Sequence, residues 1–321
     1  MISREQLRAF RWQDVGDAPL IPHPRFSPLI ADPAVVAPEE SPDGLWHLFA
    51  HSAWGIHAYS STDSRSWRDH GIVVRHAMRP WVFHDAGQWQ LLYERYPAFG
   101  LALTVLPARR WRSWIEMRSS PDLKGWRSPR ILLEPSLSWH ASPGKGDAVG
   151  NPCLVKAGVR YRLYYSASLT WIPDCGFNEP AFIGVAESDT LEGPYVPQPR
   201  PMLQADPADP LSNLSPGCIR VVALADGWAG FQNGMSLVSG VSSSALLLLS
   251  SADGLRWERA APMPIVSPGA GWKASHVYAA CPVPRPGGEI LLYYNARSAA
   301  RLRNGRECIG LACGRPAEGR E

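Results

Sequence analysis

The chain has 321 residues, of which 45% are apolar and 19% charged, a composition that supports a large hydrophobic core and excludes intrinsic disorder. Its net charge of +3 is close to balanced and no basic stripe is present, so nucleic acid is not an expected partner. The charged stretch 1–17 lacks the apolar centre of a signal peptide and no apolar run reaches membrane-spanning length, so we expect a cytoplasmic protein with no membrane partner and leave its oligomeric state open.

The chain repeats one strand–turn–strand pattern five times. Each copy begins with a small or turn residue, often Pro, and a polar turn joins its short apolar strand to a second strand rich in Tyr, Leu and Phe. In chain order, the strand pairs are expected at 31–36 and 46–52, 79–85 and 89–95, 150–156 and 161–168, 217–224 and 228–234, and 280–285 and 290–297. Diverged copies spaced about 45–70 residues apart are typical of a radial all-β array.

A third strand follows each pair, and in four copies it ends in a turn that contains an Asp. The third strands are expected at 55–61, 114–120, 182–188, 245–251 and, in the last copy, 308–314. The turn residues are Asp63, Asp122, Asp189 and Asp253, each followed four to six residues later by an aromatic. A short carboxylate that accepts backbone N–H groups closes a tight turn, so this repeated placement indicates a structural role for these four acids.

These repeats predict one all-β domain over residues 1–321, a five-bladed β-propeller with four-stranded antiparallel blades. The approximate blades are 25–74, 75–136, 145–204, 212–266 and 274–315. The last copy lacks an obvious outer strand, and we expect the segment 10–24 to supply it and close the ring. The physical reason is that an incomplete blade would expose the unpaired N–H and C=O groups of an edge strand.

The predicted topology gathers polar side chains on one face of the ring, around the axis. The candidates near the start of a first strand are Asp32, Arg79, Asp147, Asn151 and His276. The candidates near the end of a second strand are His51, Trp54, Glu94, Asn233, Asn295 and Arg297, with Trp171 and Glu179 in the long loop of the third copy. Carboxylates, guanidinium groups, amides and indoles together suit the recognition of a sugar, so we expect a carbohydrate substrate.

Two stretches carry a resemblance to known enzymes. The segment PLIADPAVV followed by GLWHLFAHS resembles the first blade of the furanosidase-type glycoside hydrolases of family 43 and of the related families 32, 62, 68, 117 and 130. FIGVAESDTLEGPY is similar to their third-blade turn. The resemblance covers the whole chain as a pattern, and it implies a five-bladed propeller that hydrolyses a furanoside or xyloside, as an arabinofuranosidase, xylosidase or fructosidase does.

The resemblance also implies three acids, one at the start of each of the first three blades: a general base or nucleophile, a modulator of the donor's pKa, and a general acid. Here the chain departs from it. Asp32 matches the first position, as general base or nucleophile. The second position, usually Arg-Asp-Pro, has Arg79 in place of the Asp, and the third, usually Glu-x-Pro, has Gly150 in place of the Glu. Arg79 is expected to lower the pKa of Asp32.

Three other acids are candidates for the missing proton donor: Glu179, Asp147 and Glu94. Glu179 is preferred over Asp147 because its loop carries Trp171 and overhangs the opening, where desolvation would raise its pKa. The alternative interpretation is a catalytically inactive propeller that binds a carbohydrate or another small ligand in the axial funnel.

Cofactor signals are weak in this sequence, and none is expected. His276 enters the fifth blade, where the resemblance implies that some relatives place a His near an axial metal ion, so calcium near His276 is the alternative. The six cysteines form no C-x-x-C pair. Cys153, Cys218 and Cys281 occupy one position in three copies and are expected to be small buried residues on inner strands.

Overall fold

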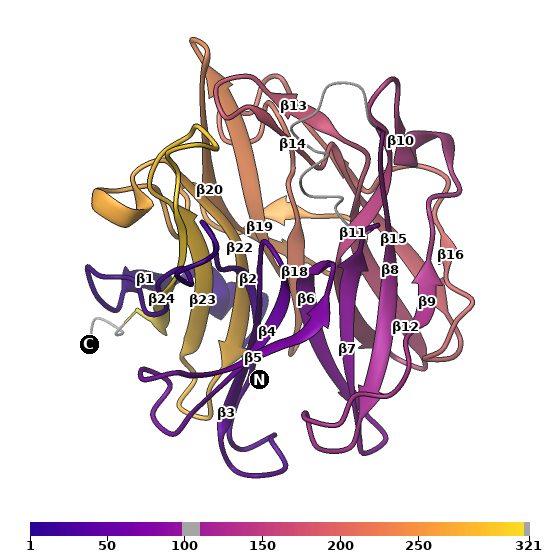
Figure 1. Cartoon of the computed structure of the whole chain (residues 1–321). Coiled ribbons are helices and arrows are strands. Elements are labelled where there is room, and N and C mark those ends of the chain that lie inside the picture. The colour runs from indigo at the N-terminus through magenta and orange to yellow at the C-terminus, as the bar shows by residue number, and fades with distance from the viewer. Residues whose placement is uncertain (98–109, 318–321) are drawn as a thin grey trace.

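The computed structural model describes residues 1–97 and 110–317, and its strands form blades around a central axis (Figure 1). Each blade contains four strands that are hydrogen-bonded antiparallel in order from the axis outward, which confirms the predicted five-bladed propeller. Its α-helix, α1 (Arg4–Arg8), has five residues, and no helix in the described ranges is long and apolar enough to cross a bilayer.

The strands of the five blades lie close to the predicted positions. The first blade contains β2 (Ala31–Val36), β3 (Trp46–Ser52), β4 (Gly55–Ser61) and β5 (Arg68–Arg75), and the second contains β6 (Ala77–Asp85), β7 (Gln88–Arg95), β8 (Trp111–Ser120) and β9 (Arg130–Leu133). The third contains β11 (Gly146–Ala157), β12 (Arg160–Ala167), β15 (Phe182–Ser188) and β16 (Val196–Pro197), with β17 (Leu203–Gln204) also along β15. The fourth contains β18 (Ile219–Leu224), β19 (Gly227–Val238), β20 (Val241–Ser251) and β21 (Glu258–Arg259), and the fifth contains β22 (His276–Pro284), β23 (Ile290–Arg297), β24 (Glu307–Pro316) and β1 (Phe10–Asp14).

The N-terminal strand closes the ring, as predicted. β1 pairs antiparallel with β24, from Phe10 opposite Pro316 to Asp14 opposite Ala312. Phe10 is buried in a cluster with the apolar residues of the fourth and fifth blades. Strands from the two ends of the chain therefore complete one blade, and the edge of β24 is covered.

Three of the four Asp turns have the expected hydrogen bonds. Asp63, Asp122 and Asp253 each accept two backbone N–H groups from residues two and three positions further on. Asp189 differs, because its carboxylate pairs with Arg160 at 2.8 Å. The tryptophans that follow Asp63, Asp122 and Asp253 each pack edge-on against an aromatic ring of another blade, for example Trp126 against Phe49. These acids therefore serve the scaffold.

The inner strands of the first three blades begin with an unusual backbone geometry. Asp32, Arg79 and Asn151 have φ values of 52°, 57° and 49°, and each lies at a β-bulge and immediately before a proline. Left-handed φ in a residue other than glycine costs about 1–3 kcal/mol and clusters at functional sites. The repeated bulge turns each of these three side chains toward the axis, where all three line one pocket.

The closing strand gives a direct test of ring closure. Phe10→Ala removes a buried aromatic side chain and should lower the free energy of unfolding by about 3–5 kcal/mol. Arg11→Ala, on the exposed side of the same strand, should change it by less than about 0.5 kcal/mol. Urea unfolding of both variants measures the difference, and equal stabilities would contradict a closing role for β1.

Candidate active site

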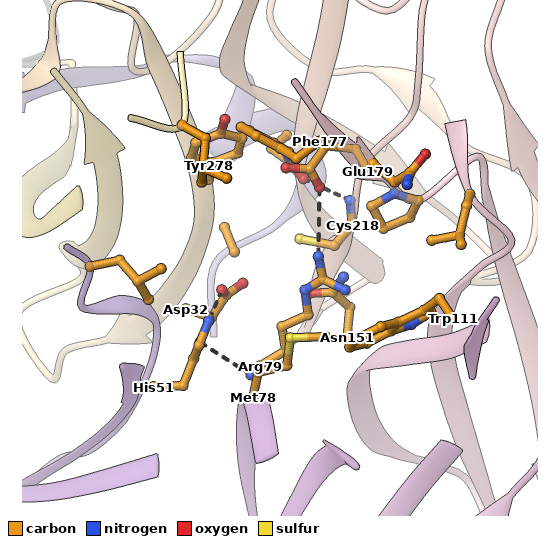
Figure 2. Close-up of a pocket in the computed structure, with 18 of the residues that line it drawn as sticks. Asp32, His51, Met78, Arg79, Trp111, Asn151, Phe177, Glu179, Cys218 and Tyr278 are labelled. Carbon is orange, nitrogen blue, oxygen red and sulfur yellow. Dashed lines mark hydrogen bonds and ion pairs between the residues drawn. The ribbon is translucent and has the colours of Figure 1, made fainter. Parts of the chain in front are cut away.

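A pocket of about 540 Å³ opens at the axis, on the face where the inner strands begin (Figure 2). Its volume is in the range that holds small ligands. Nine of the thirteen residues predicted from the sequence line it: Asp32, His51, Arg79, Asn151, Trp171, Glu179, Asn233, Asn295 and Arg297. The pocket therefore brings together side chains from all five blades.

Asp32 is a buried carboxyl held by its neighbours. Its backbone N–H donates to Asn295 Oδ1 at 3.2 Å. Burial raises the pKa of Asp32, and the positive charges of Arg79 and Arg220 oppose that rise. Arg79 thus acts on this pKa in the predicted direction, but desolvation outweighs its charge and the net pKa of Asp32 is raised.

His51 is a neutral neighbour of Asp32. Its Nδ1 accepts the backbone N–H of Arg79 at 3.3 Å, so this nitrogen carries a lone pair and no proton. Burial, and then the charge of Arg79, lower the pKa of His51 to about 3. The 3.4 Å approach of Nδ1 to Asp32 Oδ2 is thus a contact between a neutral ring and a carboxyl, and it gives Asp32 no counter-charge.

Glu179 comes from a hairpin in the long loop of the third blade, formed by β13 (Thr170–Ile172) and β14 (Phe177–Glu179). The hairpin is fixed to neighbouring blades, since Asp174 accepts the Ser242 N–H at 2.9 Å and the Cys175 carbonyl accepts the Leu302 N–H at 3.0 Å. The side chain is therefore held in place before a ligand binds.

The surroundings of Glu179 favour its protonated form. Burial is the largest influence and raises its pKa to about 7; Arg79 opposes the rise, while the negative charges of Glu307 and Asp32 add to it. A carboxyl with this pKa is suited to donate a proton near neutral pH.

Arg79 joins two acids, and one of them occupies the space beside Gly150. Arg79 Nη1 donates to Glu94 at 2.9 Å, and Nη2 lies 3.6 Å from Glu179. Glu94 is buried behind the pocket and does not line it. A Cβ built on Gly150 would lie 1.7 Å from Glu94 Oε2, so the absence of a side chain at Gly150 is what admits this carboxylate.

The backbone shows which residue of the third blade corresponds to Asp32 and Arg79. Asn151, with its left-handed φ at the bulge, stands where Asp32 and Arg79 stand in their blades. The side chain that the resemblance expects at Gly150, one residue earlier, is absent. The polar group that the third blade offers to the axis is thus the amide of Asn151.

Sequence reasoning missed one acid of the pocket, Glu307. It begins β24 and accepts from Arg297 at 2.7 Å and from Asn295 Nδ2 at 3.1 Å. Because Asn295 also accepts the Asp32 N–H, this amide connects the two acids. The signal was present, since Glu307 follows the loop between a second and a third strand, as Glu179 does.

Three buried polar atoms of the pocket wall have no hydrogen-bond partner within the described part of the chain. They are Asn151 Oδ1, Asn178 Oδ1 and Tyr278 Oη, and all three residues line the pocket. Buried polar groups are nearly always satisfied in folded proteins. These three atoms are therefore exceptions in an otherwise satisfied pocket wall.

Four predicted residues do not line the pocket: Asp147, Trp54, Glu94 and His276. Asp147 pairs with Arg112 at 3.0 Å, and the exposed Trp54 donates its indole N–H to the Phe26 carbonyl at 2.8 Å. The sequence pattern identified their face of the ring but not the direction of these side chains.

His276 does not fit a metal site. Its Nε2 faces Ser242 Oγ at 3.0 Å, its Nδ1 faces Ser275 Oγ at 2.6 Å, and its ring stacks on Tyr278. Among residues 1–97 and 110–317, no group of three or more His, Cys, Asp or Glu side chains is arranged to hold a metal ion. Both ring nitrogens are thus engaged with hydroxyls, and the histidine supports Tyr278.

The cysteines of the inner strands are buried, as expected. Cys153 accepts the backbone N–H of Val221 at 3.2 Å, and Cys281 accepts that of Val35 at 3.3 Å. Cys218 lines the pocket, but burial raises its pKa to about 12. It therefore remains a thiol and is a poor nucleophile.

Comparison with known proteins supports the fold. No family model matches the sequence, and no curated protein matches it. Among solved structures, the catalytic domain of a family 62 α-L-arabinofuranosidase from Coprinopsis cinerea is 17% identical, with 96% of this chain and 98% of that chain covered and a TM-score of 0.66.

Two further structures are similar over most of their length. An N-acetylgalactosamine deacetylase from F. plautii is 14% identical, with 95% of each chain covered and a TM-score of 0.64. A family 117 glycoside hydrolase from Zobellia galactanivorans is 14% identical, with 96% of this chain and 91% of that chain covered and a TM-score of 0.61. These similarities confirm the fold that the resemblance implied.

The space beside Gly150 gives a second test. Gly150→Ala should displace Glu94 from Arg79 and lower the free energy of unfolding by about 1–3 kcal/mol, because the added methyl overpacks a buried site. Gly287→Ala is the matched control, since nothing lies within 4 Å of its Cβ position. Urea unfolding compares the two variants. If the losses in free energy of unfolding caused by Gly150→Ala and Glu94→Ala simply add in the double variant, the two residues do not interact and the proposed clash is contradicted.

Proposed function

We propose that this protein hydrolyses the glycosidic bond of a furanoside or xyloside, with Glu179 as the proton donor and Asp32 as general base or nucleophile. The observation that carries the proposal is that a buried carboxyl group from the first blade, Asp32, and a largely buried one from the third, Glu179, line one pocket, and that the pKa of Glu179 is raised to about 7. Glycosidases use such a pair of carboxyls on either side of the bond that breaks.

Glu179 supplies the proton that the leaving oxygen needs. With a pKa of about 7, a large fraction of this carboxyl is protonated at neutral pH, and the same group is basic enough afterwards to accept a proton from water. The anchored hairpin holds the carboxyl in one place, so the enzyme spends little energy on orienting it.

Asp32 acts on the sugar carbon or on the attacking water. The positive charges of Arg79 and Arg220 favour its ionised form against the cost of burial. The neutral His51 does not compete for a proton, because its pKa is about 3. The hydrogen bond from the Asp32 backbone N–H to Asn295, together with the β-bulge, fixes the direction of the Asp32 carboxylate.

Glu307 acts as the third acid, the one that adjusts the pKa of the proton donor. The resemblance places that acid in the second blade, where this chain has Arg79. Glu307 lines the same pocket from the fifth blade, and its negative charge raises the pKa of Glu179. The three acidic roles are thus filled from the first, third and fifth blades.

The choice of a furanoside or xyloside as substrate rests on the residues that line the pocket and on the structurally similar proteins. Asn151, Asn178 and Tyr278 line the pocket with amide and phenol groups, a chemistry that suits sugar hydroxyls. Trp111 and Phe177 offer aromatic surface to the apolar face of a sugar ring. One similar structure is an α-L-arabinofuranosidase, whereas another is an N-acetylgalactosamine deacetylase, so the fold by itself does not select the reaction.

A second candidate function is sugar binding without catalysis. The ion pair between Arg79 and Glu179, at 3.6 Å, favours it, because a neighbouring guanidinium stabilises the carboxylate over the acid that catalysis needs. Burial and the charges of Glu307 and Asp32 outweigh this effect at Glu179, which is why we place hydrolysis first.

Substitution of the two carboxyls tests the assignment. Against a panel of nitrophenyl furanosides and pyranosides, Asp32→Asn and Glu179→Gln should each lower kcat/KM by about 10²–10⁴-fold or more, since each removes a group that acts in the transition state. Asp226→Asn is the control, because Asp226 is an exposed acid that pairs with Arg4 and does not line the pocket, so kcat/KM should stay unchanged. Full activity of Asp32→Asn would remove Asp32 from the mechanism, and oligosaccharide binding without turnover would favour the second candidate.

The pH profile tests the role of Glu307. Glu179 must be protonated to donate, so kcat/KM should fall as the pH rises through about 7. Glu307→Gln removes a negative charge that raises this pKa, and the alkaline limb should move to lower pH. Glu289→Gln, which removes an acid outside the pocket, should leave the limb in place. An alkaline limb that Glu307→Gln does not move would show that Glu307 does not tune the donor.

A further inference from the structure

Within residues 1–97 and 110–317, two cationic side chains of the pocket have no acid partner. Arg79, Arg297 and Arg112 each have a carboxylate partner, namely Glu94, Glu307 and Asp147. Arg110 and Lys145 also line the pocket and take part in no ion pair within the described residues. The stretch 98–109 contains no Asp or Glu in its sequence, so it offers them no carboxylate either.

The backbone places both cations beside Trp111. The Trp111 N–H donates to the Lys145 carbonyl at 2.8 Å, and Trp111 pairs with Gly146 where β8 and β11 run parallel. This approach needs a glycine, because Gly146 has a φ of 126° and a Cβ there would lie 1.9 Å from the Trp111 carbonyl oxygen. Arg110 precedes Trp111 in the chain, so both cations come from residues that adjoin Trp111 in the backbone, and all three line the pocket.

Trp111 is held as a wall of the pocket. Its indole N–H donates to Ser113 Oγ at 3.2 Å, and its ring packs against Tyr96 with centroids 5.5 Å apart. Figure 2 places Trp111 across the pocket from Asp32 and His51. A negative group bound beside Trp111 would therefore lie away from the Asp32 carboxylate that acts in the reaction.

We propose that the ligand of this pocket is a sugar that carries an anionic substituent, a carboxylate, sulfate or phosphate ester, which Arg110 and Lys145 bind while the sugar ring packs on Trp111. A guanidinium and an ammonium group form strong charge-assisted hydrogen bonds with such oxygens. The nearby Arg112 adds little net charge, since Asp147 and Glu134 lie 3.0 and 3.7 Å from it. The inference rests on the proposed function for the reaction, but binding does not require turnover.

Calorimetric binding to the full chain tests this proposal with one sugar ring in several forms. The probes are glucose, glucuronic acid, glucose 6-sulfate, glucose 6-phosphate and inorganic phosphate. At least one anionic sugar should bind about tenfold or more tightly than both glucose and inorganic phosphate, since hydrogen bonds to charged groups contribute that much. Raising the salt concentration should weaken that binding and leave glucose binding unchanged.

Two single variants and a control identify the residues. Arg110→Gln and Lys145→Gln should each weaken the anionic sugar about tenfold or more and leave glucose unaffected. Lys124→Gln is the control for total charge, because Lys124 is exposed and pairs with Asp43 outside this pocket. Equal affinities for glucose and all three anionic sugars, or equal loss in the control variant, would overturn the proposal. Inorganic phosphate binding as tightly as the anionic sugars would also overturn it, by showing an anion site that does not recognise the sugar.

The same measurements in Asp32→Asn separate this proposal from the proposed function. This variant keeps Arg110, Lys145 and Trp111, so its preference for the anionic sugar should persist even though hydrolysis is lost. A wild-type protein that prefers the anionic sugar but hydrolyses nothing would leave the ligand assignment standing and overturn the glycosidase. A protein that hydrolyses neutral glycosides and shows no preference for the anionic sugar would leave the glycosidase standing and overturn the ligand assignment.

Discussion

The ion pairs of the largely buried guanidinium of Arg79 are the interactions on which the site depends. The guanidinium lies between acids of three blades: it bonds Glu94, pairs with Glu179 and acts on Asp32 through its charge. Burial works against its charge, but the fields of Glu94, Glu179 and Asp32 more than compensate and raise its pKa above the ordinary range. Breaking a buried pair of this kind typically costs about 3–5 kcal/mol, because the partner is left as an uncompensated charge. The residue that replaces an expected acid therefore holds the remaining acids in position.

A second buried cation, Arg220, explains how the axis tolerates the bulged inner strands. The bulge in β11 removes Asn151 and Pro152 from the ladder with β12, and the guanidinium of Arg220 donates to both of their carbonyls. The same guanidinium lies over the ring of Trp81, 5.3 Å from its centroid. Backbone groups that the bulge would leave unsatisfied are thus paired, and a positive charge is fixed where it acts on Asp32.

The repeats predicted the fold because each blade forms from the same local pattern of strands and turns. Alternating apolar strands, Asp turns and a missing outer strand are visible in one dimension, and the structure has them where they were expected. The site was only partly predictable, since a strand pattern gives the face of a residue and not its partners. Nothing local to Gly150 shows that Glu94, from another blade, fills the space beside it. The net pKa of Asp32 likewise depends on burial, which no single segment determines.

The departures from the familiar arrangement of acids follow from the symmetry of the ring. Every blade delivers a residue to the axis near the start of its inner strand, and the third and fifth blades also do so from the connection between their second and third strands. An acid lost at one of these positions is replaceable from another blade at little cost to the fold, because the axis is equally close to all five. In this chain the second blade presents Arg79, while Glu179 and Glu307 reach the pocket from such loops of the third and fifth blades. The position of Glu179 at the end of an anchored hairpin then matters more than its place in a motif, because the hairpin supplies both the burial and the fixed geometry that a proton donor requires.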